Sequence, residues 1–108
     1  MEYVGRDIKL YLIEGCDKFI PRPYCKIGIS KNPDNRFKQI QNVIPFALNL
    51  RRIWMQNELR LHPETIEMVV KREYRNHGRT MYSKREWFDV CPTRVEHSIE
   101  WFDENYMK

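Results

Sequence analysis

The stretch that decides the fold is residues 24–37, which read YCKIGISKNPDNRF. Its first half alternates in hydrophobicity with a period of two, as in a half-buried strand, through Cys25, Ile27 and Ile29. Its second half predicts a helix start, because Asn32 can cap free backbone N–H groups and Pro33 suits the first helical position. The apolar residues that follow have helical spacing: Phe37, Ile40 and Ile44. Residues 24–44 therefore predict a strand that leads directly into a helix.

A second alternating segment precedes this strand, across a short loop that contains prolines (residues 16–23). Its apolar positions are Ile8, Leu10 and Leu12. We expect the two strands to pair antiparallel. Tyr11 has the opposite parity to the apolar positions of the first strand, and Lys26 has the opposite parity to those of the second. Both side chains are therefore expected on the same, non-core face.

Downstream, the pattern predicts a strand at residues 46–54, a helix at 63–76, a loop at 79–85 and a short strand at 87–90. In the first of these strands Arg51 and Arg52 break the strict alternation. His62 is expected in a loop or a helix cap. Pro92 is expected to end the short strand. The order predicts an α+β fold with a small, three- to four-stranded, mainly antiparallel sheet flanked by helices.

A C-terminal amphipathic helix is predicted at about residues 93–106. Thr93 and Glu96 have the spacing of a capping box. The apolar stripe behind them has helical spacing: Val95, Ile99, Phe102 and Tyr106. We therefore expect this helix to pack on the core, which we place at about residues 8–90.

Composition limits the class of protein. The 108 residues suffice for one hydrophobic core, so we expect a single domain over residues 1–108. A formal charge of +4 and a pI near 9.1 favour a polyanionic partner, either nucleic acid or an anionic membrane. The three cysteines include no CxxC pair, which argues against a disulfide framework or a four-ligand zinc site. We expect no signal peptide, no membrane span and a cytoplasmic location, in a bacterial or phage-infected cell.

Three short motifs, in order along the chain, resemble the core of the GIY-YIG endonuclease superfamily. They are Lys9-Leu10-Tyr11, Lys26-Ile27-Gly28 and the Asn-Pro-Asp-Asn-Arg segment at residues 32–36. The Lys-Ile-Gly form of the second motif, and a Glu-Trp-Phe triplet at residues 86–88, are similar to the small phage and bacterial branch. The resemblance spans about residues 8–90 and implies metal-dependent hydrolysis of phosphodiester bonds.

By position, the resemblance implies a single site made of Tyr11, Lys26, Arg36 and Glu67. Tyr11 would act as the base or orient the attacking water, and the Lys26 cation would favour its phenolate form. Arg36 would donate forked hydrogen bonds to the scissile phosphate. Glu67 would hold one divalent cation, Mg²⁺ or Mn²⁺, with water and substrate oxygens completing the shell. One departure is that Lys71 stands where this branch has a histidine.

Each site residue also has a plainer interpretation. Tyr11 could be an ordinary strand aromatic, Lys26 a solvated strand lysine and Arg36 an exposed helix arginine. Glu67 could form an i,i+4 ion pair with Lys71. The rival carboxylates on the same helix are Glu64 and Glu73, which we expect to be more exposed. Glu86 is interpreted as structural, with Trp87 and Phe88 as core anchors.

The densest basic stretch is expected to follow a phosphate backbone, and it comprises Lys71, Arg72, Arg75, Arg79, Lys84 and Arg85. The alternative is a solvated basic face. DNA is favoured over RNA as the partner. Two other functions stay open: a nucleic-acid-binding module without turnover, indicated by Lys71, and a module that docks on a host or phage protein through its last helix. The oligomeric state is left open.

Overall fold

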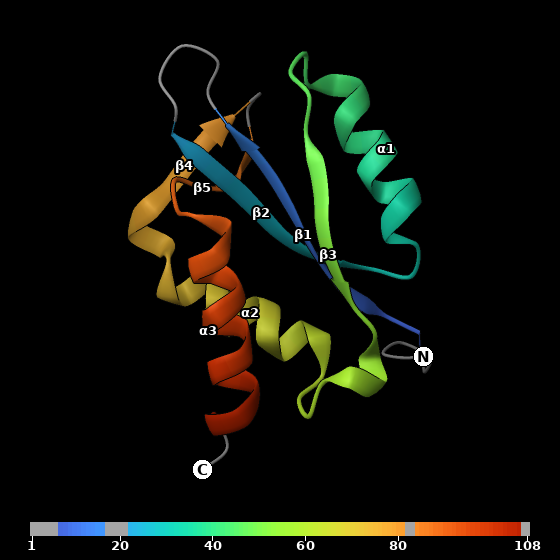
Figure 1. Cartoon of the computed structure of the whole chain (residues 1–108), viewed down its shortest axis with the longest axis vertical. Coiled ribbons are helices and arrows are strands. Elements are labelled where there is room, and N and C mark those ends of the chain that lie inside the picture. Colours follow the sequence, from blue (N-terminus) through green and yellow to red (C-terminus); the bar gives the residue numbers. More distant parts are fainter. Residues whose placement is uncertain (1–6, 17–21, 82–83, 107–108) are drawn as a thin grey trace.

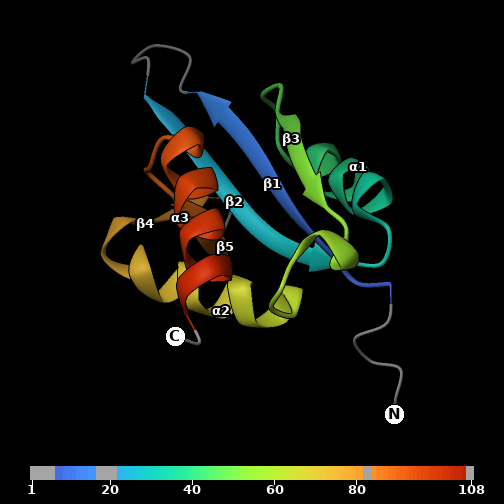
Figure 2. The same cartoon turned by 60° about the horizontal axis from the view of Figure 1, so that its bottom comes forward.

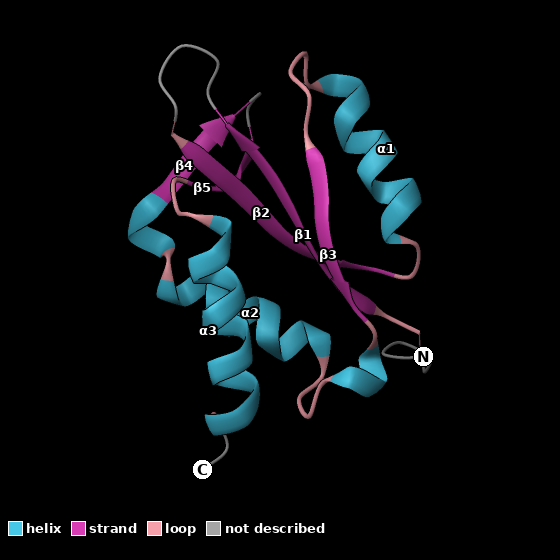
Figure 3. Ribbon diagram, viewed as in Figure 1, coloured by secondary structure: helices cyan, strands magenta, loops and turns pink. Residues whose placement is uncertain are grey.

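The computed structural model describes residues 7–16, 22–81 and 84–106, with the side chains of residues 79–86 left out of that description. Within these residues the strands are β1 (Lys9–Cys16), β2 (Pro23–Ser30), β3 (Asn49–Trp54), β4 (Gly78–Met81) and β5 (Lys84–Phe88). The helices are α1 (Pro33–Val43), α2 (Pro63–Glu73) and α3 (Pro92–Asn105), with short 3₁₀ turns at η1 (Gln56–Glu58) and η2 (Arg75–His77). Figure 3 shows the strands and helices of the fold, and the predicted α+β class is confirmed. No helix among these residues is long and apolar enough to cross a membrane.

The described strands form one antiparallel sheet in the order β3-β1-β2-β5-β4 (Figure 1). The predicted pairing of β1 with β2 is confirmed, with Tyr11 opposite Gly28. The predicted loop at residues 79–85 is wrong, because β4 and β5 pair antiparallel there and the sheet gains a fifth strand. The polar residues of these two strands lack the hydrophobic alternation that identifies a strand, so their pairing depends on backbone hydrogen bonds to a neighbour.

Both faces of the sheet are packed. One face carries Leu10, Leu12 and Ile27 in a cluster with residues of α2 and α3. The other face carries Tyr11, Ile13, Tyr24 and Trp87 in a cluster with Ile40 and Ile44 at α1. Figures 1 and 2 show α1 well apart from α2 and α3. The expected non-core face is therefore a second, smaller core beneath α1.

Local capping signals place two of the three helix starts. The side chain of Asn32 accepts a hydrogen bond from the Asn35 backbone N–H at 3.1 Å, as predicted for α1. His62 caps α2, since its Nδ1 accepts from the Glu64 backbone N–H at 3.1 Å. Pro33 and Pro63, which follow these caps, are each the first residue of their helix, a position that suits a residue without a backbone N–H group.

The predicted capping box of the last helix is wrong. α3 begins at Pro92, with Cys91 as its N-cap, and Pro92 therefore opens a helix and does not end a strand. Thr93 Oγ1 instead accepts a hydrogen bond from Arg51 Nη2 at 3.1 Å, and the Glu96 carboxylate accepts one from the same nitrogen at 3.1 Å. Arg51, which is distant in the sequence, thus binds both side chains that the local pattern assigned to the helix cap.

Candidate functional site

The first two motifs meet across the β1–β2 ladder, where Tyr11 lies directly opposite Gly28. A Cβ atom built on Gly28 would overlap Oη and Cζ of Tyr11 and would lie 2.9 Å from its Cε2. The tyrosine ring therefore lies across the glycine backbone, and only glycine leaves room for it. Gly15 and Tyr24 repeat this arrangement, with Tyr24 Cζ 2.6 Å from the corresponding Cβ position. The glycine of the Lys-Ile-Gly motif is thus explained by packing.

Lys26 is buried, with 5% of its surface exposed, on the same face as Tyr11, which is 2% exposed. In the strand register Lys26 pairs with Ile13 on one side and Trp87 on the other. The interpretation of Lys26 as a solvated strand lysine is therefore wrong. Because an ammonium group is costly to bury and lysine is rarely fully buried, this position is unusual for a purely structural residue. By register Lys26 and Tyr11 are diagonal neighbours beneath α1.

Arg36 lies on α1, the helix that covers the face of Tyr11 and Lys26. Its side chain is exposed, and Nη1 donates a hydrogen bond to Gln39 Oε1 at 3.3 Å. The helix buries Ile40 and packs Phe37 against the same cluster, so Arg36 stands at the solvent edge of this layer. Three of the four predicted residues therefore lie on one side of the sheet.

Glu67 lies elsewhere. Its helix, α2, packs through Ile66, Val69 and Val70 on the opposite face of the sheet. Glu67 Oε2 forms the i,i+4 ion pair with Lys71 Nζ at 3.2 Å, which is the plainer interpretation of this residue. Within residues 7–16, 22–81 and 84–106, no three His, Cys, Asp or Glu side chains gather to hold a metal ion. The role of Glu67 as a metal ligand stays a prediction, and so does the single four-residue site.

Two further sets of predicted positions are the rival carboxylates and the Glu-Trp-Phe triplet. The rival carboxylates, Glu64 and Glu73, are exposed, as expected. Trp87 and Phe88 are buried on opposite faces of the sheet, which confirms them as core anchors, whereas the Glu86 side chain lies outside the described residues.

The basic stretch is described only in part. Lys71, Arg72 and Arg75 lie at the end of α2 and in η2, where Lys71 is half-buried and the two arginines are exposed. Lys71 and Arg72 also suit the negative end of the helix dipole, which is the plainer interpretation of their position. The side chains of Arg79, Lys84 and Arg85 lie outside the described residues.

Sequence reasoning missed an ionic network around Arg51. The ladder between β1 and β3 shifts register between Leu12 and Ile13, so that Arg51 is the extra residue of a β-bulge. Arg51 Nη1 binds Glu14 Oε1 at 2.8 Å and its Nε lies 3.0 Å from Glu96 Oε2, which ties β1 and β3 to α3. Burial opposes ionisation of Glu14, but hydrogen bonds from Asn49 and Arg51 outweigh it and lower the pKa of this carboxyl. The broken alternation at residues 51–52 was the available signal.

Comparison with known proteins identifies the family. A family model described as the T5orf172 domain matches residues 10–103, from β1 to α3. No curated protein and no solved structure matches the chain significantly. The T5orf172 domain is phage-associated and falls within a GIY-YIG-like, nuclease-like group, so the resemblance is confirmed at this coarser level. Because the match spans most of the described fold, the chain belongs to the T5orf172 domain family, for which a nuclease-like or DNA-binding role is indicated.

Proposed function

We propose that this protein is a metal-dependent endonuclease that hydrolyses phosphodiester bonds in nucleic acid, with DNA favoured over RNA. The observation that carries the proposal is the juxtaposition of Tyr11 and Lys26 on one face of the sheet, with Lys26 only 5% exposed. A cation in a layer of low polarity favours a phenolate nearby, and a phenolate can accept a proton from water. This pair supports acid–base chemistry better than it supports packing alone.

The reaction requires three tasks: activation of water, neutralisation of charge on the phosphoryl oxygens and stabilisation of the leaving oxygen. Tyr11 would orient the water or accept its proton as the new P–O bond forms and the bond to the leaving sugar oxygen breaks. Arg36, exposed at the edge of the same layer, can donate two parallel hydrogen bonds to phosphate. Its guanidinium is placed at the solvent side, where a strand of nucleic acid can approach.

The metal ligand proposed is Glu67. Mg²⁺ keeps several water ligands and also binds substrate oxygens, so one protein carboxylate is sufficient to hold it. A single glutamate therefore suits Mg²⁺ better than it suits a cation whose ligands all come from the protein. A bound cation would neutralise charge on the phosphate oxygens, which requires the substrate to reach both Glu67 on α2 and Arg36 on α1, although these helices cover opposite faces of the sheet. Lys71 at 3.2 Å competes for the same carboxylate and would have to share or release it.

A second candidate is a nucleic-acid-binding module without turnover. Two observations favour it: Tyr11 is 2% exposed, and the Glu67 carboxylate is engaged by Lys71 on a helix that packs on the other face. Such a module would keep the exposed arginines at the end of α2, including Arg72 and Arg75, and would bind through phosphate contacts.

Single-turnover cleavage of labelled DNA and RNA, with Mg²⁺, Mn²⁺ or EDTA, separates these functions. We expect Glu67→Gln to abolish cleavage while binding survives, and Tyr11→Phe to reduce the rate by about a hundredfold or more. Arg36→Lys should reduce the rate more than the affinity. The matched control is Glu64→Gln, an exposed carboxylate on the same helix, which should cut as fast as wild type.

The outcomes are distinct. Cleavage by Glu67→Gln at the wild-type rate refutes the metal assignment, and the same result for Tyr11→Phe refutes the assignment of the base. If the wild type binds DNA but never cuts with any metal, the binding module replaces the nuclease. In that case the salt dependence of binding remains informative, because Arg72→Ala with Arg75→Ala should reduce the log–log slope by about 0.9 for each lost contact.

A further inference from the structure

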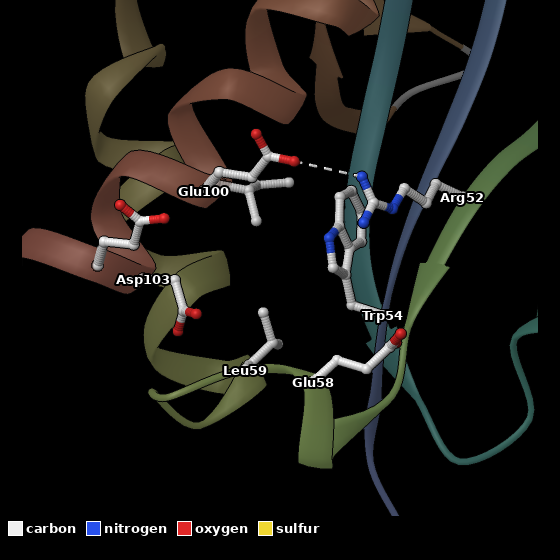
Figure 4. Close-up of a pocket in the computed structure, with 8 residues that line it drawn as sticks. Arg52, Trp54, Glu58, Leu59, Glu100 and Asp103 are labelled. Carbon is white, nitrogen blue, oxygen red and sulfur yellow. Dashed lines mark hydrogen bonds and ion pairs between the residues drawn. The ribbon is translucent and has the colours of Figure 1, made fainter.

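A pocket of about 330 Å³ opens on the sheet face away from Tyr11, between the end of β3, the η1 turn and the C-terminal half of α3 (Figure 4). Its apolar wall consists of Trp54, Leu59 and Ile99. Trp54 and Ile99 belong to the core, with exposed fractions of 3% and 0%, so they support the pocket from beneath and expose almost no surface of their own. A partner side chain would therefore meet the half-buried Leu59 and the polar groups of the lining.

The polar lining of the pocket is acidic. Its carboxylates come from η1 and α3, and they are Glu58, Glu100, Asp103 and Glu104. The cation in the lining is Arg52. The lining therefore has an excess of negative charge, although the chain as a whole carries +4. Nucleic acid is repelled by such a surface, whereas a basic segment of a protein is attracted.

The pocket already binds one guanidinium from within the chain. The Arg52 guanidinium carbon lies 4.6 Å from the centroid of the Trp54 ring, and its Nη1 lies 3.4 Å from Glu100 Oε2. Figure 4 shows this stack and the dashed contact to Glu100 at the side of the pocket. An aromatic face with a carboxylate beside it is the environment that arginine prefers. Arg52 thus occupies the Trp54 face and Glu100, and Glu58 Oε1 accepts a hydrogen bond from the Met55 backbone N–H at 2.6 Å. An incoming cation would be bound by the remaining carboxylate oxygens of the lining.

The carboxylate of Asp103 is held in a fixed position. Its Oδ1 accepts hydrogen bonds from the backbone N–H groups of Arg60 and Leu61, both at 2.8 Å. These bonds tie α3 to the segment that follows η1. Because the carboxylate is already held in place, its second oxygen would lose little conformational freedom when it binds a cation, which favours binding.

An exposed aromatic residue lies on α3 within one helical turn of a residue that lines the pocket. Trp101 has 59% of its surface exposed and packs edge-on against Phe102, with ring centroids 5.4 Å apart. On α3 it stands one turn before Asn105 and is the i−3 neighbour of Glu104, which lines the pocket. A large exposed tryptophan beside a charged pocket is typical of an interface anchor.

We infer that this pocket and Trp101 form a docking surface for a basic segment of a partner protein, which places an arginine in the pocket and an apolar side chain against Trp101. The charge complementarity of the lining selects a basic occupant, and the forked guanidinium of arginine suits carboxylates better than the ammonium group of lysine does. None of its residues is among those proposed for nucleic acid, although Glu67 and Arg72 of α2 lie on the same side of the sheet. The inference therefore stands whether or not the protein cleaves nucleic acid.

The test uses the whole chain and a fluorescein-labelled peptide that alternates arginine with leucine, measured by fluorescence anisotropy. The matched peptide has citrulline in place of each arginine, which keeps the shape and removes the charge. We expect the arginine peptide to bind at least about tenfold more tightly than the citrulline peptide. Trp101→Ala should weaken binding by about tenfold and Glu104→Gln by about threefold.

Matched control variants are Met68→Ala and Glu64→Gln, both on α2, where Met68 is 46% exposed and Glu64 is also exposed. They should bind the peptide like wild type. Circular dichroism checks the fold of each variant, and the exposed positions of Trp101 and Glu104 make unfolding unexpected.

Three results would overturn the inference. The first is equal binding of the two peptides, or binding by Trp101→Ala and Glu104→Gln that matches wild type. The second is a wild-type dimer in sedimentation that Trp101→Ala dissociates, because the occupant is then a second copy of this chain. The third is a loss of DNA binding in Trp101→Ala, because the surface then serves nucleic acid.

Discussion

The packing of Tyr11 over Gly28 predicts that Gly28→Ala destabilises the protein through the tyrosine. The added methyl group would overlap the ring, with Cε2 at 2.9 Å and Oη and Cζ closer still. Tyr11 cannot swing away freely, because only 2% of its surface is exposed and it lies in the cluster beneath α1. The strand or the ring must therefore shift.

The magnitude follows from two opposing terms. Inserting a methyl group into a packed core costs about 1–3 kcal/mol, and this overlap belongs at the upper end. Replacing glycine by alanine in a strand returns about 0.5–1 kcal/mol, because the unfolded chain loses freedom. We therefore expect a net loss of about 2 kcal/mol in the free energy of unfolding. For a domain of this size that corresponds to a fall in Tm of about 8 °C.

Thermal and urea unfolding of four proteins would measure the effect: wild type, Gly28→Ala, Tyr11→Leu and the double variant. The cost of Gly28→Ala should largely vanish once the ring is gone, which gives a coupling energy of about 2 kcal/mol. The control is Gly78→Ala, because Gly78 is exposed and has a φ of −63°, and an added Cβ would lie 3.3 Å from its nearest atom, the Arg75 carbonyl oxygen, without the overlap found at Gly28. An unchanged Tm for Gly28→Ala, or an equal cost with and without the tyrosine ring, would refute the reasoning.

Three further predictions concern the rest of the fold. Arg51→Met should lower stability by about 1–3 kcal/mol in urea unfolding at about pH 7, because the carboxylates that it joins are left unpaired. The lowered pKa of Glu14 contributes stability that is present above the unfolded pKa of this carboxyl and is lost as pH falls. The destabilisation by Arg51→Met should therefore be smaller at about pH 3 than at about pH 7. Equal destabilisation at the two pH values would contradict this prediction. Cys91 should react with iodoacetamide faster than Cys25 in timed mass spectrometry. The backbone N–H groups of Thr93 and Arg94 lower the pKa of Cys91, whereas burial raises the pKa of Cys25 to about 12. Faster labelling of Cys25 in the folded protein would contradict this prediction. Removing α3 should uncover the core of the α2 face and abolish cooperative thermal unfolding, so a truncated chain that melts like wild type would remove α3 from the folding unit.

What the sequence determined alone is local. The alternation around Leu10 and Ile27 identified β1 and β2 as strands, and Asn32 with Pro33 placed the start of α1. The parity of Tyr11 and Lys26 was also readable, because successive side chains of a strand alternate between faces whatever the rest of the chain does. Such features depend on neighbours within a few residues, so a single sequence contains them.

What only the tertiary structure decided depends on which distant element covers which face. The strand alternation predicts that Lys26 and Tyr11 share a face of the sheet, but it does not predict that both are buried beneath α1. It also does not predict that α2, which carries Glu67, packs on the opposite face of the sheet. The bulge at Arg51 depends on the pairing of β3 with β1, and the hydrogen bond from the Arg51 guanidinium to Thr93 joins residues 42 positions apart. The acidic pocket likewise combines β3, η1 and α3. Burial and ion pairing are properties of the assembled layers, because the desolvation of a side chain depends on all the groups that the folded chain packs around it. A local periodicity in the sequence does not contain this information.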